Sequence, residues 1–250
     1  MRTGLLLLLA LLAFAAPALA ATGDALNLML ASRWPDGPCY GVHWEGDIAY
    51  FGNGGSVEIV DFSDPGNPVD LAQILVPGPV LGLDKAGDLL VVAAWTDGLR
   101  VIDVSDPANP WELGHLDAPQ YTYDVAVEGT TAVIAEYHDG MRVVDISNPA
   151  APAVLGHWDT DDRAHGIDLV GDHAYVADWA GGLCVVDISN PAAPTAASVF
   201  AAADECFHVD VVDTLAYLAD QTNGLRIVSV ADPASPVELS LYDTPSYAWE

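Results

Sequence analysis

The stretch GLRVIDVSDPANP, residues 98–110, decides the fold because the chain repeats it. It returns as GMRVVDISNPAAP at 140–152 and as GLCVVDISNPAAP at 182–194, with looser copies at 56–68 and 224–236. A period of about 40–45 residues is typical of four-stranded propeller blades. Here the period is 42 residues, marked by one recurring aspartate at Asp61, Asp103, Asp145 and Asp187, with Ser229 in the same phase.

One repeat contains four short runs rich in β-forming residues, at 123–128, 132–136, 141–146 and 153–158, separated by Gly, Asn, Asp and Pro. No run keeps helical spacing over three turns. Adjacent apolar residues within a run indicate a sheet that is buried on both faces. A single blade cannot bury both of its faces, so copies must stack against one another. We therefore predict an all-β fold, a β-propeller of four-stranded antiparallel blades.

The propeller is expected to span residues 26–250. Residues 26–33 resemble an outer strand and 247–250 resemble the start of an inner strand. Since these two strands would complement each other in one blade, we predict a ring of six or more blades, with a five-bladed ring as the alternative. Five full blades are predicted at about 40–79, 80–121, 122–163, 164–205 and 206–245.

The N-terminus has the pattern of a secretory signal peptide at residues 1–20: Arg2, an apolar run at 5–16 and an Ala-Leu-Ala cleavage site. The run is too short to span a bilayer. We expect cleavage near Ala20, a secreted or cell-surface location and no transmembrane segment. The formal net charge of −29 at pH 7 opposes nucleic acid and anionic lipid as partners. We interpret it as a solvated acidic surface, with attraction of divalent cations or basic partners as the alternative.

The Asp-x-Ser-Asp/Asn-Pro-x-x-Pro motif predicts a turn after each third strand, in which Ser105, Asp106 and Asn148 accept hydrogen bonds from nearby backbone N–H groups. Calcium is the alternative explanation of the repeated acids. Their recurrence in every blade favours a structural role, and we expect no cofactor. The structural turn residues are Asp61, Asp103, Asp145, Asp187, Pro107, Pro149 and Pro191.

The three cysteines, Cys39, Cys184 and Cys206, are odd in number, so at least one thiol lacks an internal disulfide partner. Their spacing does not match a zinc site. We interpret them as small apolar residues, and the sequence leaves open whether two of them form a bridge.

Two sets of loops are expected on one face of the propeller: those joining the fourth strand of a blade to the next blade, and those joining its second and third strands. They carry aromatic and histidine side chains, which are typical of recognition surfaces for sugars or proteins; packing within the loops is the alternative. The candidate ligand-binding residues are Trp95, Tyr121, Tyr123, Tyr137, His138, His165, Trp179, Phe207 and His208, with Trp249 and Gln221 on the same rim.

His165 and His208 also raise the alternative of a metal or acid–base site, because several acids lie near them in the sequence. The spacing of DTDDRAHG does not match a calcium loop, and no nucleophile or zinc-protease motif is present. We therefore assign no catalytic residue and no metal ligand. The neighbouring acids are Asp159, Asp161, Asp162, Asp204 and Glu205.

The phrases GLRVIDVSDPANP, YTYDVAVEG and HAYVADWAGGL resemble the LVIVD-repeat family of exported bacterial and archaeal proteins, as does the segment at 33–55. The resemblance covers residues 26–250 almost continuously. It implies a secreted or surface propeller without a common catalytic activity. The sequence departs from the family pattern at Ser229, at Cys184 in place of arginine, and in a shorter loop near Asn53.

Three functions fit these observations. The first is an exported non-catalytic module for binding, adhesion or assembly, with a protein or carbohydrate partner at the cell surface. The second is a propeller-type lyase or hydrolase acting on extracellular polysaccharide, which requires His165, His208 and a carboxylate to converge. The third is a structural spacer in a larger surface protein.

Overall fold

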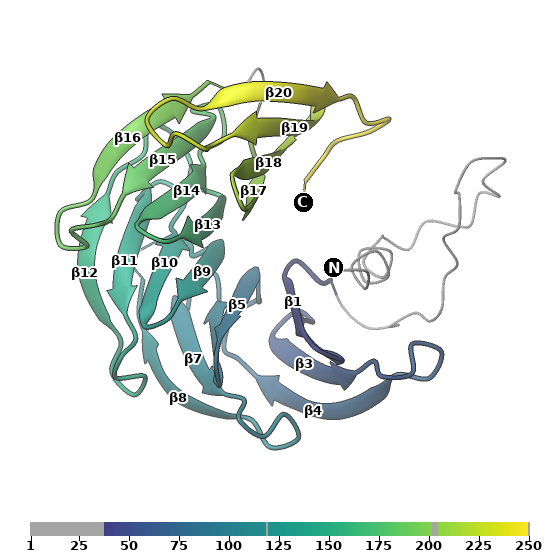
Figure 1. Cartoon of the computed structure of the whole chain (residues 1–250). Coiled ribbons are helices and arrows are strands. Elements are labelled where there is room, and N and C mark those ends of the chain that lie inside the picture. Colours follow the sequence, from purple (N-terminus) through teal and green to yellow (C-terminus); the bar gives the residue numbers. More distant parts are fainter. Residues whose placement is uncertain (1–37, 119, 202–204, 250) are drawn as a thin grey trace, which may run out of the picture.

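The computed structural model describes residues 38–118, 120–201 and 205–249, and these form five four-stranded antiparallel sheets arranged as blades along an arc (Figure 1). The predicted all-β propeller fold is confirmed. The predicted signal peptide and the predicted strand at 26–33 lie outside the described residues. The described residues form no helix, and so none that could cross a bilayer.

Each blade is a meander of four consecutive strands, and the first strands of successive blades pack side by side along the inner edge of the arc (Figure 1). The fourth strands lie on the outside. The strands are β1 (Val42–Glu45), β2 (Ile48–Gly52), β3 (Ser56–Asp61), β4 (Val69–Leu75), β5 (Gly82–Ala86), β6 (Leu89–Ala93), β7 (Leu99–Asp103), β8 (Trp111–Leu116), β9 (Asp124–Glu128), β10 (Thr131–Ala135), β11 (Met141–Asp145), β12 (Ala153–Trp158), β13 (Gly166–Val170), β14 (His173–Ala177), β15 (Leu183–Asp187), β16 (Thr195–Phe200), β17 (His208–Val212), β18 (Leu215–Asp220), β19 (Gly224–Ser229) and β20 (Val237–Tyr242).

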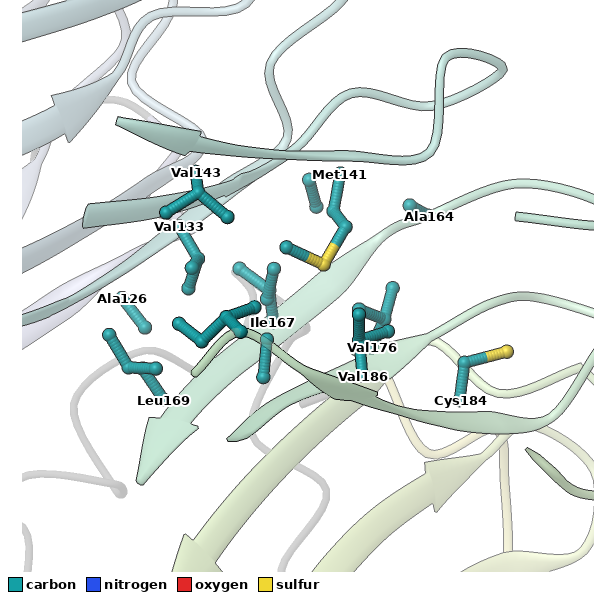
Figure 2. Packing of buried hydrophobic residues seen from close by; sticks show 13 residues of the cluster. Ala126, Val133, Met141, Val143, Ala164, Ile167, Leu169, Val176, Cys184 and Val186 are labelled. Atoms are coloured by element: carbon teal, nitrogen blue, oxygen red, sulfur yellow. The ribbon is translucent and has the colours of Figure 1, made fainter. Parts of the chain in front are cut away.

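The core of the protein lies between blades, and each inner blade contributes to two cores. Val143 of β11 packs into a cluster with Ile167 and Val176 of the fourth blade (Figure 2). Its neighbour Val144 packs into a different cluster, with Val91 of the second blade. Successive strand residues point to opposite faces, so both faces of the third blade are buried. This confirms that the paired apolar residues of the repeat serve two interfaces.

Inner-strand aspartates tie neighbouring blades together. One carboxylate oxygen of each accepts the backbone N–H of the next residue on its own strand, and the other accepts an N–H from the following blade. Burial raises the pKa of Asp124 to about 7 and that of Asp168 to about 6. The bonds between blades run from Val127 to Asp84 at 2.7 Å, from Ile167 to Asp124 at 3.0 Å and from Val211 to Asp168 at 2.6 Å.

The repeated motif forms a turn between the third and fourth strands. Asp103 Oδ1 accepts the backbone N–H of Ser105, and the N–H of Asn109 donates to the carbonyl of Asp106 across Pro107. Ser105 also donates its hydroxyl to Asp103, whereas we expected it to accept a hydrogen bond. Asp106 Oδ1 accepts the N–H of Ala108, as expected. The corresponding aspartate bonds involve Asp61, Asp145 and Asp187, and the corresponding turns contain Pro149 and Pro191.

A buried acid lies at the end of the second strand in the last three blades, but its partner differs. Arg142 Nε lies 2.7 Å from Glu136 Oε2, and Arg226 Nε lies 2.6 Å from Asp220 Oδ2. In the fourth blade Cys184 occupies the arginine position, and among the described residues no cation pairs with the fully buried Asp178. Desolvation raises the pKa of Asp178 to about 6.

We expect Gly166→Ala to destabilise the protein, because the inner strands β13 and β17 approach backbone to backbone. A Cβ at Gly166 would lie 2.7 Å from the Cα of His208 and 2.9 Å from the carbonyl oxygen of Phe207. The expected loss is about 1–3 kcal/mol of unfolding free energy, measured by urea denaturation. Gly55→Ala is the control, since its Cβ would have no neighbour closer than 3.5 Å. Equal stability of the two variants would contradict this description of the inner strands.

We expect Asp178→Asn to stabilise the protein at pH 8 but not near pH 4. A carboxyl whose pKa is raised on folding disfavours the folded state once it ionises, so its cost grows as the pH rises from about 4 to above 6. The expected gain at pH 8 is about 1–3 kcal/mol, from urea denaturation at both pH values. The control is Asp172→Asn in an exposed turn. A gain that is equal at the two pH values would show that ionisation of Asp178 is not its cause.

Candidate functional site

The two sets of loops predicted to share a face are joined there by backbone hydrogen bonds. In the second to fifth blades, the loop between the second and third strands forms an isolated bridge with the segment that follows the fourth strand. The N–H of Thr122 donates to the carbonyl of Trp95 at 2.9 Å, for example. Four such bridges follow one another: Trp95 with Thr122, Tyr137 with Ala164, Trp179 with Cys206 and Gln221 with Ala248.

The loop residue in each bridge has a left-handed backbone conformation. The φ angles are 50° at Trp95, 50° at Tyr137, 44° at Trp179 and 27° at Gln221. Bulky side chains rarely adopt this region, which glycine occupies without steric cost. Three successive blades therefore hold an aromatic residue in a strained conformation at the same loop position.

The side chains of these loops form a continuous series of ring contacts. Trp95 stacks on Tyr121 with centroids 5.1 Å apart, and Tyr123 stacks on Tyr137 at 5.2 Å. His165 lies at the centre, 4.5 Å from Tyr123. The contacts involve the three connections from the second to the fifth blade and the segment that follows β20. We call this surface the aromatic loop face: Trp95, Tyr121, Tyr123, Tyr137, His138, His165, Trp179, Phe207, Tyr247 and Trp249.

Eight of the nine candidate ligand-binding residues lie in this face, some at its solvent edge and some within it. Trp95 and Tyr121 are 37% and 38% exposed, and His138 is exposed beside the ring of Tyr137. Trp179 and Phe207 are half-buried, with ring centroids 4.5 Å apart. The face therefore combines exposed rings with half-buried rings that pack against one another.

His165 is uncharged at neutral pH. Desolvation among the surrounding rings, with the nearby Arg163 charge, lowers its pKa to about 4. Its Nε2 atom is buried and has no hydrogen-bond partner. A neutral imidazole in this place contributes ring surface and one unsatisfied polar atom to the face.

His208 is the ninth candidate and lies elsewhere, toward the inner strands. Its Nδ1 atom is 3.7 Å from Asp124 Oδ2, two blades away. Gly166 lies between them, and a Cβ there would come within 3.1 Å of His208 Nδ1. Because Gly166 has no side chain, the ring of His208 can approach the carboxylate of Asp124.

The two histidines accordingly have different surroundings: rings around His165 and a carboxylate beside His208. Within residues 38–118, 120–201 and 205–249, no group of three or more His, Cys, Asp or Glu side chains could hold a metal ion. Asp204 lies outside these ranges. Cys39, Cys184 and Cys206 form no disulfide, and Cys184 and Cys206 are buried.

Two residues of this surface were not predicted from the sequence: Tyr247 and, more importantly, Arg163. Its guanidinium carbon lies 5.5 Å from the ring centroid of Tyr137 and 5.0 Å from that of Trp179. The only signal in the sequence was its position as the single cation in the acidic loop DTDDRAHG. Tyr247 was also absent from the candidates, although it contacts Trp249.

Comparison with solved structures supports the fold. The chain is similar to the β-propeller domain of Myceliophteria thermophila Cps50 (Swd1), with a TM-score of 0.67 and 15% identity over 84% of this chain and 74% of that one. It is also similar to the computationally designed Ika8 protein, with a TM-score of 0.64 and 12% identity. That alignment covers 84% of this chain and 63% of the designed chain.

The comparison of sequences identifies the family. No curated protein matches the chain. The family described as LVIVD repeat matches it five times, once in each blade, at residues 37–73, 84–118, 119–160, 162–201 and 208–244. These segments cover most of the chain and agree with the resemblance of its motifs, so the chain belongs to the LVIVD repeat family.

Proposed function

We propose that this LVIVD-repeat propeller is an exported, non-catalytic binding module that holds a protein or carbohydrate partner on its aromatic loop face. The observation that carries the proposal is the left-handed aromatic residue at one loop position in three successive blades, Trp95, Tyr137 and Trp179. Strained residues of this kind cluster at functional sites.

The strain supports recognition because the backbone bridge alone does not require an aromatic side chain. Glycine would form the same bridge without a steric cost, whereas a bulky residue in the left-handed region costs about 1–3 kcal/mol. The side chains instead extend a surface of rings that remains partly exposed at Trp95 and Tyr121. Aromatic side chains with polar tips are the residues that dominate the binding energy of recognition surfaces.

Two further observations agree with the proposal. His165 and His208 are held in different surroundings, which favours binding over acid–base chemistry. Export rests on the signal-peptide pattern at residues 1–20. The module would then meet its partner outside the membrane.

The test is binding of the chain from residue 21 onward to a glycan array and to peptides of basic, neutral and acidic composition. We expect a ligand whose affinity falls about 10-fold or more in Trp95→Ala, because truncating an exposed ring of the binding face removes the contact area that it offers to the ligand. The control is Trp111→Ala, since Trp111 is 57% exposed at the opposite end of its blade. It should bind like the unaltered protein.

Two outcomes would contradict the proposal. One is a ligand that binds equally to the unaltered protein and to both tryptophan variants, because its site would then lie off the aromatic loop face. The other is depolymerisation of an extracellular polysaccharide that is abolished in His208→Ala, since this would establish catalysis at the inner strands.

A further inference from the structure

Arg163 lies on the aromatic loop face as a cation on two rings. Its guanidinium carbon is 5.5 Å from the centroid of Tyr137 and 5.0 Å from that of Trp179. Both distances are within the range over which a cation is attracted to the face of an aromatic ring. The two rings come from the strained loop positions of the third and fourth blades, and Arg163 comes from the loop between these blades. The loops thus form a binding site for a guanidinium group.

Two arginines of the described strands are held in a different way. Arg142 and Arg226 each place Nε within 2.7 Å of a buried carboxylate. Arg163 Nε is buried and lies 3.8 Å from Asp162 Oδ1, which is too long for a hydrogen bond, and within the described part of the chain it has no hydrogen-bond partner. Arg163 is also about one-third exposed. Ring contacts therefore hold this side chain in place of a tight ion pair, and it can be displaced.

The loops of this face carry exposed acidic residues. Asp159 and Asp161 are exposed in the same loop as Arg163, and Asp117 and Asp243 are exposed at the corresponding points of two other loops. The whole chain carries 36 acidic and only 7 basic residues. Rings that accept a cation, within an acidic rim, are complementary to a positively charged ligand.

We propose that the aromatic loop face binds a lysine- or arginine-rich segment of a partner protein, whose cationic side chain replaces Arg163 on Tyr137 and Trp179. This inference rests on the proposed function and specifies its partner. Arg163 then acts as an internal competitor. Its removal should strengthen binding, although it deletes a side chain from the site itself.

The experiment measures calorimetric binding of an arginine-containing peptide to the unaltered protein and to Arg163→Gln. The matched ligand carries citrulline, which is neutral, in place of each arginine. We expect Arg163→Gln to bind the arginine peptide roughly 2- to 30-fold more tightly, because the rings no longer hold an internal cation. Trp179→Ala should lose binding of this peptide. Raising the salt concentration from about 0.1 M to about 1 M should weaken it by screening the acidic rim.

If a variant fails to fold, the comparison of the arginine and citrulline peptides still tests the proposal, because it requires only the unaltered protein. Equal affinity for the two peptides, or weaker binding of the arginine peptide by Arg163→Gln, overturns the cationic partner. Binding of a neutral oligosaccharide that Arg163→Gln weakens would also overturn it, while the proposed binding function would stand. If neither peptide nor any glycan binds through the aromatic loop face, both proposals fail.

Discussion

The burial of both faces of every inner blade is the constraint on which the structure depends. Val143 and Val144 are consecutive residues, yet they belong to cores on opposite sides of the third blade. A sheet of four short strands cannot shield both faces by itself, so its stability comes from neighbouring copies. The copies must also approach closely at the inner edge, where Gly166 leaves room for the backbone of β17. Close packing between blades therefore requires both the apolar residues on each face and the absence of a side chain at Gly166.

The packing of the blades against one another also positions the loops of the aromatic loop face. Close packing of the inner strands brings each loop between the second and third strands beside the loop that enters the next blade, and their backbones bond there. That bond fixes the left-handed conformation at Trp95, Tyr137 and Trp179, whatever their side chains are. The side chains are then free to differ between blades, as Gln221 at the same position shows. A uniform backbone therefore supports a face whose chemistry varies from blade to blade.

The sequence alone predicted the blades well because the repeat is local. The runs predicted at 123–128 and 141–146 became β9 (Asp124–Glu128) and β11 (Met141–Asp145). The sequence alone did not predict the position of His208, which we grouped with His165. The residue one period after His165 is Phe207, so His208 is one step further along the chain and points to another side, as alternation along a strand requires. The contact between His208 and Asp124 spans two blades and depends on Gly166, so no local pattern could reveal it.

Arg163 was missed for a related reason, and its position shows how the charge of the protein is distributed. In sequence it is one cation among aspartates, which suggests a solvated loop. In the fold its loop joins two blades, and each of these blades contributes one ring, Tyr137 or Trp179, to the contact with Arg163. The acidic surface acts over long distances and attracts cations of any kind, whereas the rings act at contact and select for geometry. In our proposal, a partner that the acidic surface attracts must also displace Arg163, so attraction and selection depend on different residues of the same face.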